Sequence, residues 1–152
     1  MASELVRYLA GRGTDARDRT AADVIALSDQ ELEMHHDWVQ WLFPLPTPSS
    51  AVPGSPVLSE ADIAAIKSDP VAIAMLERAI DRMITFYERT DHWLQRYDHN
   101  HLRIARMLQS ISLLLGPSAA RVFFDRLMAL HESAGAPVNP TSLQYWRDAI
   151  RG

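Results

Sequence analysis

The feature that most constrains the fold is the helical period of the apolar residues, which recur every three or four positions almost throughout the chain. No stretch shows the strict alternation of apolar and polar residues that is typical of a half-buried strand. The period is clearest over 70–88, with Ile73, Leu76, Ile80, Met83, Ile84 and Tyr87, and over 101–115, with Leu102, Ile104, Met107, Leu108, Ile111 and Leu115. The sequence therefore predicts an all-α protein.

Capping signals indicate where these helices begin. Ser28 and Glu31 are spaced as a capping box, in which each side chain binds a backbone N–H of the first turn. Asp69 followed by Pro70 is a good N-cap and N1 pair, and Thr20 is a plausible cap. Further boxes are Ser59 with Asp62 and Thr141 with Gln144. We expect about seven or eight helices, drawn from segments 3–10, 21–27, 29–42, 59–67, 70–88, 91–97, 101–115, 117–131 and 141–150.

Segment 44–57 interrupts the helical pattern. It contains Pro44, Pro46, Pro48, Pro53 and Pro56, and so many prolines are incompatible with a helix. Because apolar residues flank it, we expect an extended, polyproline-like strap across the surface of the domain rather than a free linker.

Length and composition limit the class of protein. A chain of 152 residues, 47% of them hydrophobic, is expected to form a single compact domain over 1–152. The absence of cysteine excludes disulfides and thiolate chemistry. A formal net charge of −4 argues against a nucleic-acid partner. No segment approaches the roughly 20 apolar residues of a membrane helix, so we expect a cytoplasmic protein with no membrane partner.

The candidate functional residues lie in two polar stripes, each on one face of an expected helix. On the expected helix 29–42, helical spacing places Glu33, His36 and Gln40 on one face, bordered by apolar residues. On the helix 101–115, a second stripe comprises His99, Arg103, Arg106 and Ser110. Because partly buried charges need partners, we expect the stripes to face each other and Glu33 to pair with Arg103 or Arg106.

Three interpretations of these stripes stay open. They form a structural hydrogen-bonded network, or His36 and one arginine bind a carboxylate or phosphate of a ligand, or the histidines hold a metal or haem. The last is the weakest, because His35 and His36, like His99 and His101, point in different directions, and we expect no metal and no cofactor. Trp41 packs against the proline strap or forms a stacking wall for a ligand.

Two segments of the chain resemble the conserved N-terminal domain of the opioid growth factor receptor family. Residues 32–45, LEMHHDWVQWLFPL, are similar to its Ile-Gln-Trp-Leu-Phe-Pro-Leu block, with Val39 in the Ile position. Residues 99–108, HNHLRIARML, resemble its His-Asn-x-Leu-Arg-Ile-x-Arg-x-Leu helix. The chain departs from the family pattern at Asp18 and Glu88, where the family has glycine.

The resemblance is to a stand-alone, bacterial-type member, and it implies a fold but leaves the biochemistry open. The peptide repeats and nuclear-targeting segments of the animal receptors do not occur in the sequence, so opioid peptide binding is not expected from it. Two function classes remain. The first is a binding module for a small anionic ligand or a protein partner, with Glu33, His36, Gln40, Trp41, His99, Arg103 and Arg106 as its site. The second is a small enzyme or a His-ligated metal or haem protein using the same cluster.

Overall fold

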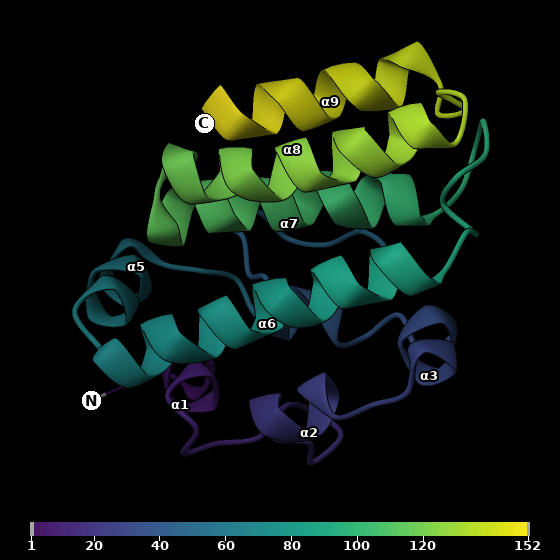
Figure 1. Ribbon diagram of the computed structural model, residues 1–152. Helices are drawn as coiled ribbons and strands as arrows, with labels where there is room; N and C mark the ends of the chain where they lie inside the picture. Colours follow the sequence, from purple (N-terminus) through teal and green to yellow (C-terminus); the bar gives the residue numbers. More distant parts are fainter. Residues whose placement is uncertain (1, 152) are drawn as a thin grey trace. The chain divides into compact units, whose positions relative to one another are not determined.

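The computed structural model describes residues 2–151, with side chains to residue 150, and every regular element in that range is a helix. The prediction of an all-α fold is therefore confirmed. Figure 1 shows the elements, which are α1 (Glu4–Leu9), α2 (Ala21–Ile25), α3 (Asp29–Met34), α4 (Val39–Leu42), α5 (Glu60–Lys67), α6 (Pro70–Arg89), α7 (Asn100–Leu115), α8 (Pro117–Ser133) and α9 (Pro140–Arg151). None of the described helices is long and apolar enough to cross a membrane.

The contacts group the chain into two compact units, Met1–Ala79 and Ile80–Gly152, with the boundary inside α6. In the first unit α1 packs against α4 and α5. Its fully buried side chains include Leu9, Trp38, Leu42 and Ile66. The expectation that 1–152 forms one domain stays a prediction, which a single cooperative unfolding transition would test.

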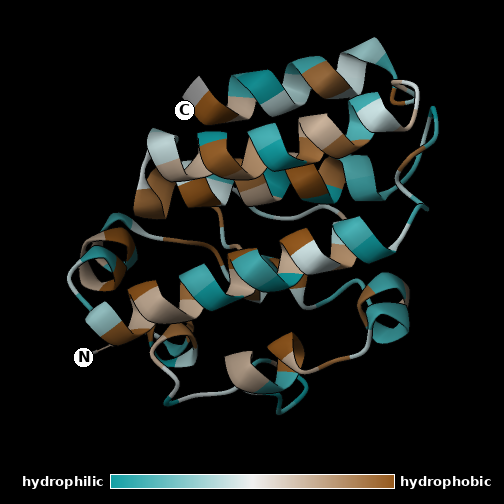
Figure 2. Ribbon diagram, in the orientation of Figure 1, coloured by the Kyte–Doolittle hydropathy of each residue, from teal (hydrophilic) through white to brown (hydrophobic). Residues whose placement is uncertain are grey.

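The second unit is built on α7, which packs against both α8 and α9 (Figure 1). Hydrophobic and hydrophilic residues fall in blocks along α8 and α9, as expected for amphipathic helices (Figure 2). The core residues of these two helices include Phe123, Leu127 and Trp146, each fully buried. Ser112 on α7 donates a hydrogen bond to the carbonyl of Ile150, which fixes the end of α9 on α7 (3.1 Å).

The helices α2, α3 and α5 each begin at a capping box. The sequence predicts the boxes at Ser28 and Ser59, and for α2 it predicts Thr20 as the cap. Thr20 and Asp23 bind each other's backbone N–H groups before α2, Ser28 and Glu31 before α3, and Ser59 and Asp62 before α5. Asp69 caps α6 as expected, accepting a hydrogen bond from the Val71 N–H at 2.9 Å. Caps of this kind contribute about 1 kcal/mol each to helix stability.

The prediction of one continuous helix over 29–42 is wrong. The first helix, α3, ends before His35 (ψ 139°), and a separate helix, α4, begins at Val39. The interruption is held by tertiary contacts. The indole N–H of Trp38 donates to the carbonyls of Leu32 (3.1 Å) and His35 (2.8 Å), which satisfies two acceptors at the end of α3. Asp37, inside the interruption, pairs with arginines about twenty residues earlier in the chain.

Two further local expectations fail for a similar reason. Residues 91–97 form turns rather than a helix, because the Trp93 indole N–H binds the carbonyls of Tyr87 and Thr90 at the end of α6. The last helix begins at Pro140 rather than after a box of Thr141 and Gln144, since the side chain of Asn139, directly before it, accepts from the Ser142 N–H at 2.8 Å. Pro140 then occupies the first helical position.

The proline-rich segment is a closed loop rather than an extended strap. The Leu58 N–H donates to the Leu45 carbonyl (2.9 Å), so the two ends of the loop 46–57 lie next to each other. The loop turns at Gly54, whose φ of 84° favours glycine. Pro44 and Leu45, at its start, are buried and belong to the core of the first unit.

Candidate functional site

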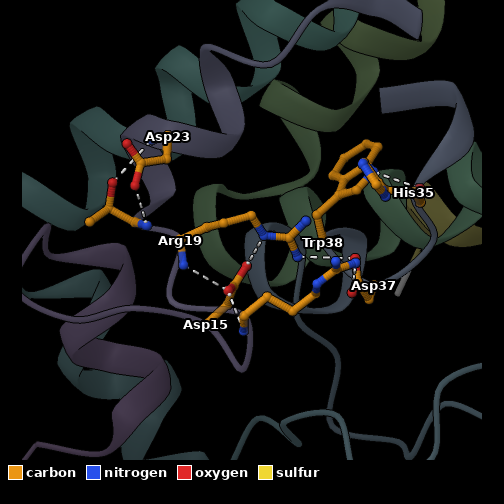
Figure 3. A network of polar contacts seen from close by, with 8 residues as sticks. Asp15, Arg19, Asp23, His35, Asp37 and Trp38 are labelled. Carbon is orange, nitrogen blue, oxygen red and sulfur yellow. Dashed lines mark hydrogen bonds and ion pairs between the residues drawn. The ribbon is translucent and has the colours of Figure 1, made fainter. Parts of the chain in front are cut away.

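An ion-pair network occupies the loop before α2 and the interruption between α3 and α4 (Figure 3). Arg19 lies between two carboxylates, donating from Nε to Asp15 (2.8 Å) and from a terminal nitrogen to Asp37 (3.0 Å). Arg17 donates to the other oxygen of Asp37 (3.3 Å). The network therefore ties two segments that the helix signals left unconnected.

Asp15 is the buried end of the network, with its side chain 1% exposed. The same carboxylate accepts hydrogen bonds from the backbone N–H groups of Arg17 (2.9 Å) and Arg19 (3.0 Å). The turn that these bonds close places Asp18 at φ 59°. This is the left-handed region that glycine adopts most easily and that aspartate tolerates better than most other residues.

Asp37 is less buried, with 30% of its side chain exposed. Partial burial opposes its ionisation, but the hydrogen bonds and charges of Arg19 and Arg17 outweigh that effect and lower the pKa of Asp37. For Arg19 burial likewise opposes the charged form, and the bonds to Asp37 and Asp15 raise its pKa. The network thus combines two carboxylates with two guanidiniums.

A cavity of about 90 Å³ lies beside the network. The indole of Trp41 and the turn at 52–55 form its walls together with Arg17, Arg19, Asp37 and Ala16. A guanidinium has five N–H donors. Arg17 uses one of them and Arg19 two in the bonds described above. The cavity thus combines an aromatic wall with guanidinium N–H groups that have no acceptor among the described residues.

The predicted residues of the first unit do not form the expected stripe, because the helix that would align them is interrupted. Glu33 is half-buried near the end of α3, and His36 is exposed in the interruption. Gln40 is buried on α4, where its Nε2 lies 3.5 Å from the Ser49 hydroxyl and its buried Oε1 has no described partner. Trp41, 7% exposed, packs edge-on against Tyr8 with ring centroids 5.4 Å apart.

The predicted residues of the second unit lie at helical spacing on α7 or directly before it. Arg103 is 8% exposed, and the hydroxyl of Ser110 is buried without a described partner. Burial lowers the pKa of Arg106 to about 10, so the guanidinium stays charged at neutral pH. His99 is exposed, with Nδ1 3.7 Å from Asp98. The pairing of Glu33 with an α7 arginine stays a prediction.

Histidine in the second unit serves the core. The His101 ring bonds the Trp93 carbonyl (2.8 Å), and its own carbonyl accepts from the Trp146 indole (2.9 Å). His131 is 3% exposed, and its Nδ1 has no described partner. Burial lowers the pKa of His131, as do the nearby His101 and Arg147, while Glu132 acts in the opposite direction. Among the described residues no group of three histidine or acidic side chains is placed to hold a metal ion.

Sequence reasoning missed Asp15, Arg17, Arg19 and Asp37 as site residues, although two signals were present. Asp15 and Arg19 have the i,i+4 spacing of an ion pair, and Asp37 lies within the distinctive 32–45 block. Neither signal shows that the two segments meet, because they are about twenty residues apart and helical periodicity relates only residues within a few turns of each other.

Comparison with known proteins finds similarity to one family. The conserved region of the opioid growth factor receptor matches residues 26–91, which include Asp37, Trp41 and the proline-rich loop. The opioid growth factor receptors of Rattus norvegicus, Mus musculus and Homo sapiens are each 28% identical over 79% of this chain. The chain is therefore similar to the conserved region of the opioid growth factor receptors, most clearly over residues 26–91.

The chain corresponds to only part of those relatives, spanning 24% of the rat protein, 22% of the mouse protein and 20% of the human protein. No solved structure matches the chain.

Proposed function

We propose that this chain is a binding module that accepts a small anionic group, such as the carboxylate of a partner's side chain, in the cavity beside Arg17, Arg19 and Trp41. The observation that carries the proposal is the set of unused guanidinium N–H donors facing a hollow with an aromatic wall. Arginine N–H groups bind carboxylates in paired, charge-assisted hydrogen bonds.

The size of the cavity limits what enters it. Its volume of about 90 Å³ is well below the roughly 300–1,000 Å³ of pockets that enclose drug-sized ligands. A carboxylate with a short stem is of suitable size. The rest of a partner would lie over the loop at 52–55.

The charges of the network limit the affinity for a free anion. Asp15 and Asp37 balance Arg17 and Arg19, so an incoming carboxylate meets no net positive charge from these four groups. Arg17 is the adaptable member, since its side chain is 59% exposed and its bond to Asp37 is the longest of the three at 3.3 Å. We therefore expect weak binding of isolated carboxylates and tighter binding of an acidic peptide, which adds contacts of its own.

A titration with succinate and with a short acidic peptide, followed by NMR, tests the proposal. The Trp41 indole N–H resonance, assigned with Trp41→Phe, and the Arg17 Nε–H resonance should both shift with saturation. Arg17→Gln should weaken peptide binding by roughly tenfold, the loss of about 1.4 kcal/mol expected for one charge-assisted pair. Arg12→Gln removes the same charge from an exposed residue outside this cavity and serves as the control. Equal losses in both variants, or no saturable shift at Trp41, would contradict the proposal.

The cluster expected from the sequence is a second candidate for the same function. Its strongest part is the pair Arg103 and Arg106, one turn apart on α7 and both substantially buried. In this candidate Glu33, His36, Gln40 and His99 complete the site. The relatives' name describes receptors, which agrees with a binding role, but opioid peptide recognition is not part of the proposal.

The enzyme alternative has less support. It needs Glu33 and His36 to act as a pair on one helix face, and α3 ends at Met34, before His36. A visible absorption band or a stoichiometric metal in the purified protein would favour the alternative of a His-ligated metal or haem protein.

A further inference from the structure

A second polar hollow lies in the unit Ile80–Gly152, where the start of α8 approaches the end of α9. This groove has a volume of about 500 Å³ and is lined by Pro117, Ser118, Arg121, Arg147 and Ile150. Two arginines from different helices thus face one concave surface. The described lining includes no carboxylate.

Neither of these arginines is neutralised by a described residue. Arg121 has one specific contact, with its guanidinium carbon 6.0 Å from the ring centre of Phe124. Arg147 makes no hydrogen bond or ion pair with a described side chain. Arg126, on the same helix as Arg121, differs because it pairs with Glu88 at 3.3 Å. The groove therefore holds two guanidiniums whose donors are available to a ligand.

The rest of the lining indicates what kind of ligand the groove suits. The stretch 99–124, which leads into α8 and supplies Arg121, has no acidic residue, and Asp125 follows one turn after Arg121. Ser118 adds a hydroxyl at the edge of the groove. Pro117 and Ile150 contribute apolar surface beside the charges, so the groove suits a ligand with an anionic end and an apolar body.

We propose that this groove binds a phosphorylated ligand, with Arg121 and Arg147 holding the phosphoryl group from two sides. A phosphate monoester carries close to two negative charges at pH 7 and three acceptor oxygens, and two guanidiniums match that charge and geometry. The groove is several times larger than the cavity beside Trp41, so it accommodates an organic phosphate. The ligand class is a phosphate monoester, carried by a small molecule or by a phosphorylated side chain.

Isothermal titration with phosphoserine, a phosphoserine peptide, adenosine monophosphate and inorganic phosphate tests the proposal and separates the possible sources. Serine and the unphosphorylated peptide are the matched negative probes. We expect saturable binding of at least one phosphate monoester and none of the negative probes. Binding should weaken with salt, as for any site built on exposed charges.

Three variants locate the site. Arg121→Gln and Arg147→Gln should each weaken binding by roughly tenfold or more, and Arg121→Lys, which keeps the charge but loses the planar fork, should weaken it less. Arg126→Gln, with the same change in net charge, should bind within about twofold of the unaltered protein. Equal weakening in Arg126→Gln, or no saturable binding of any phosphate monoester, would overturn the proposal. Arg17→Gln leaves this groove untouched, so the outcome is independent of the cavity beside Trp41.

Discussion

Removing the carboxylate of Asp15 should destabilise the first unit more than removing any other charge of the network. Its side chain is 1% exposed, and it accepts three hydrogen bonds, two from backbone N–H groups and one from Arg19 Nε. Truncating one partner of a buried pair costs about 3–5 kcal/mol, because the remaining charge stays desolvated. Asp15→Ala is therefore expected to lower the free energy of unfolding by about that amount.

The same reasoning assigns a small effect to Arg17. Its side chain is 59% exposed, and an exposed ion pair contributes roughly 0–1 kcal/mol. Arg17→Gln is the matched control, since it removes a charge from the same network without uncovering a buried partner.

A double-mutant cycle of Asp15→Ala and Arg19→Met isolates the pair. Urea unfolding followed by circular dichroism at 222 nm gives the free energy of each variant, provided that the slopes agree. We expect a coupling of about 2–3 kcal/mol, within the range found for contacting residues. A coupling near zero, or a cost of Asp15→Ala no larger than that of Arg17→Gln, would refute the account of the network.

Three further predictions follow from burial. Trp41→Ala should cost about 3–5 kcal/mol in a urea titration, as for other large core truncations, and a loss below about 1 kcal/mol would mean that the indole is not part of the core. His131 has a lowered pKa, so between about pH 6.5 and the pKa of the folded state the unfolded chain binds a proton that the folded chain does not. Over that window stability should fall with decreasing pH, by up to about 1.4 kcal/mol per pH unit, and His131→Phe should remove this dependence. If Glu33 pairs with Arg103 or Arg106, a double-mutant cycle should show coupling to one of them, whereas no coupling to either would eliminate the pair.

The sequence by itself determined the features that depend on neighbours within one helical turn. The boxes at Ser28 and Ser59 and the cap at Asp69 lie where expected, because each needs only a side chain and a backbone N–H two or three residues away. The apolar period predicted an all-helical protein for a similar reason, since a helix with one apolar face is stable only when that face is buried.

Tertiary structure decided where helices stop against their local preference and which charges meet. The interruption at 35–38 exists because the Trp38 indole takes two carbonyl acceptors and Asp37 binds Arg17 and Arg19. No short-range pattern encodes a partner about twenty residues away. The groove of Arg121 and Arg147 likewise needs two helices to approach each other, so only packing could place those charges on one surface.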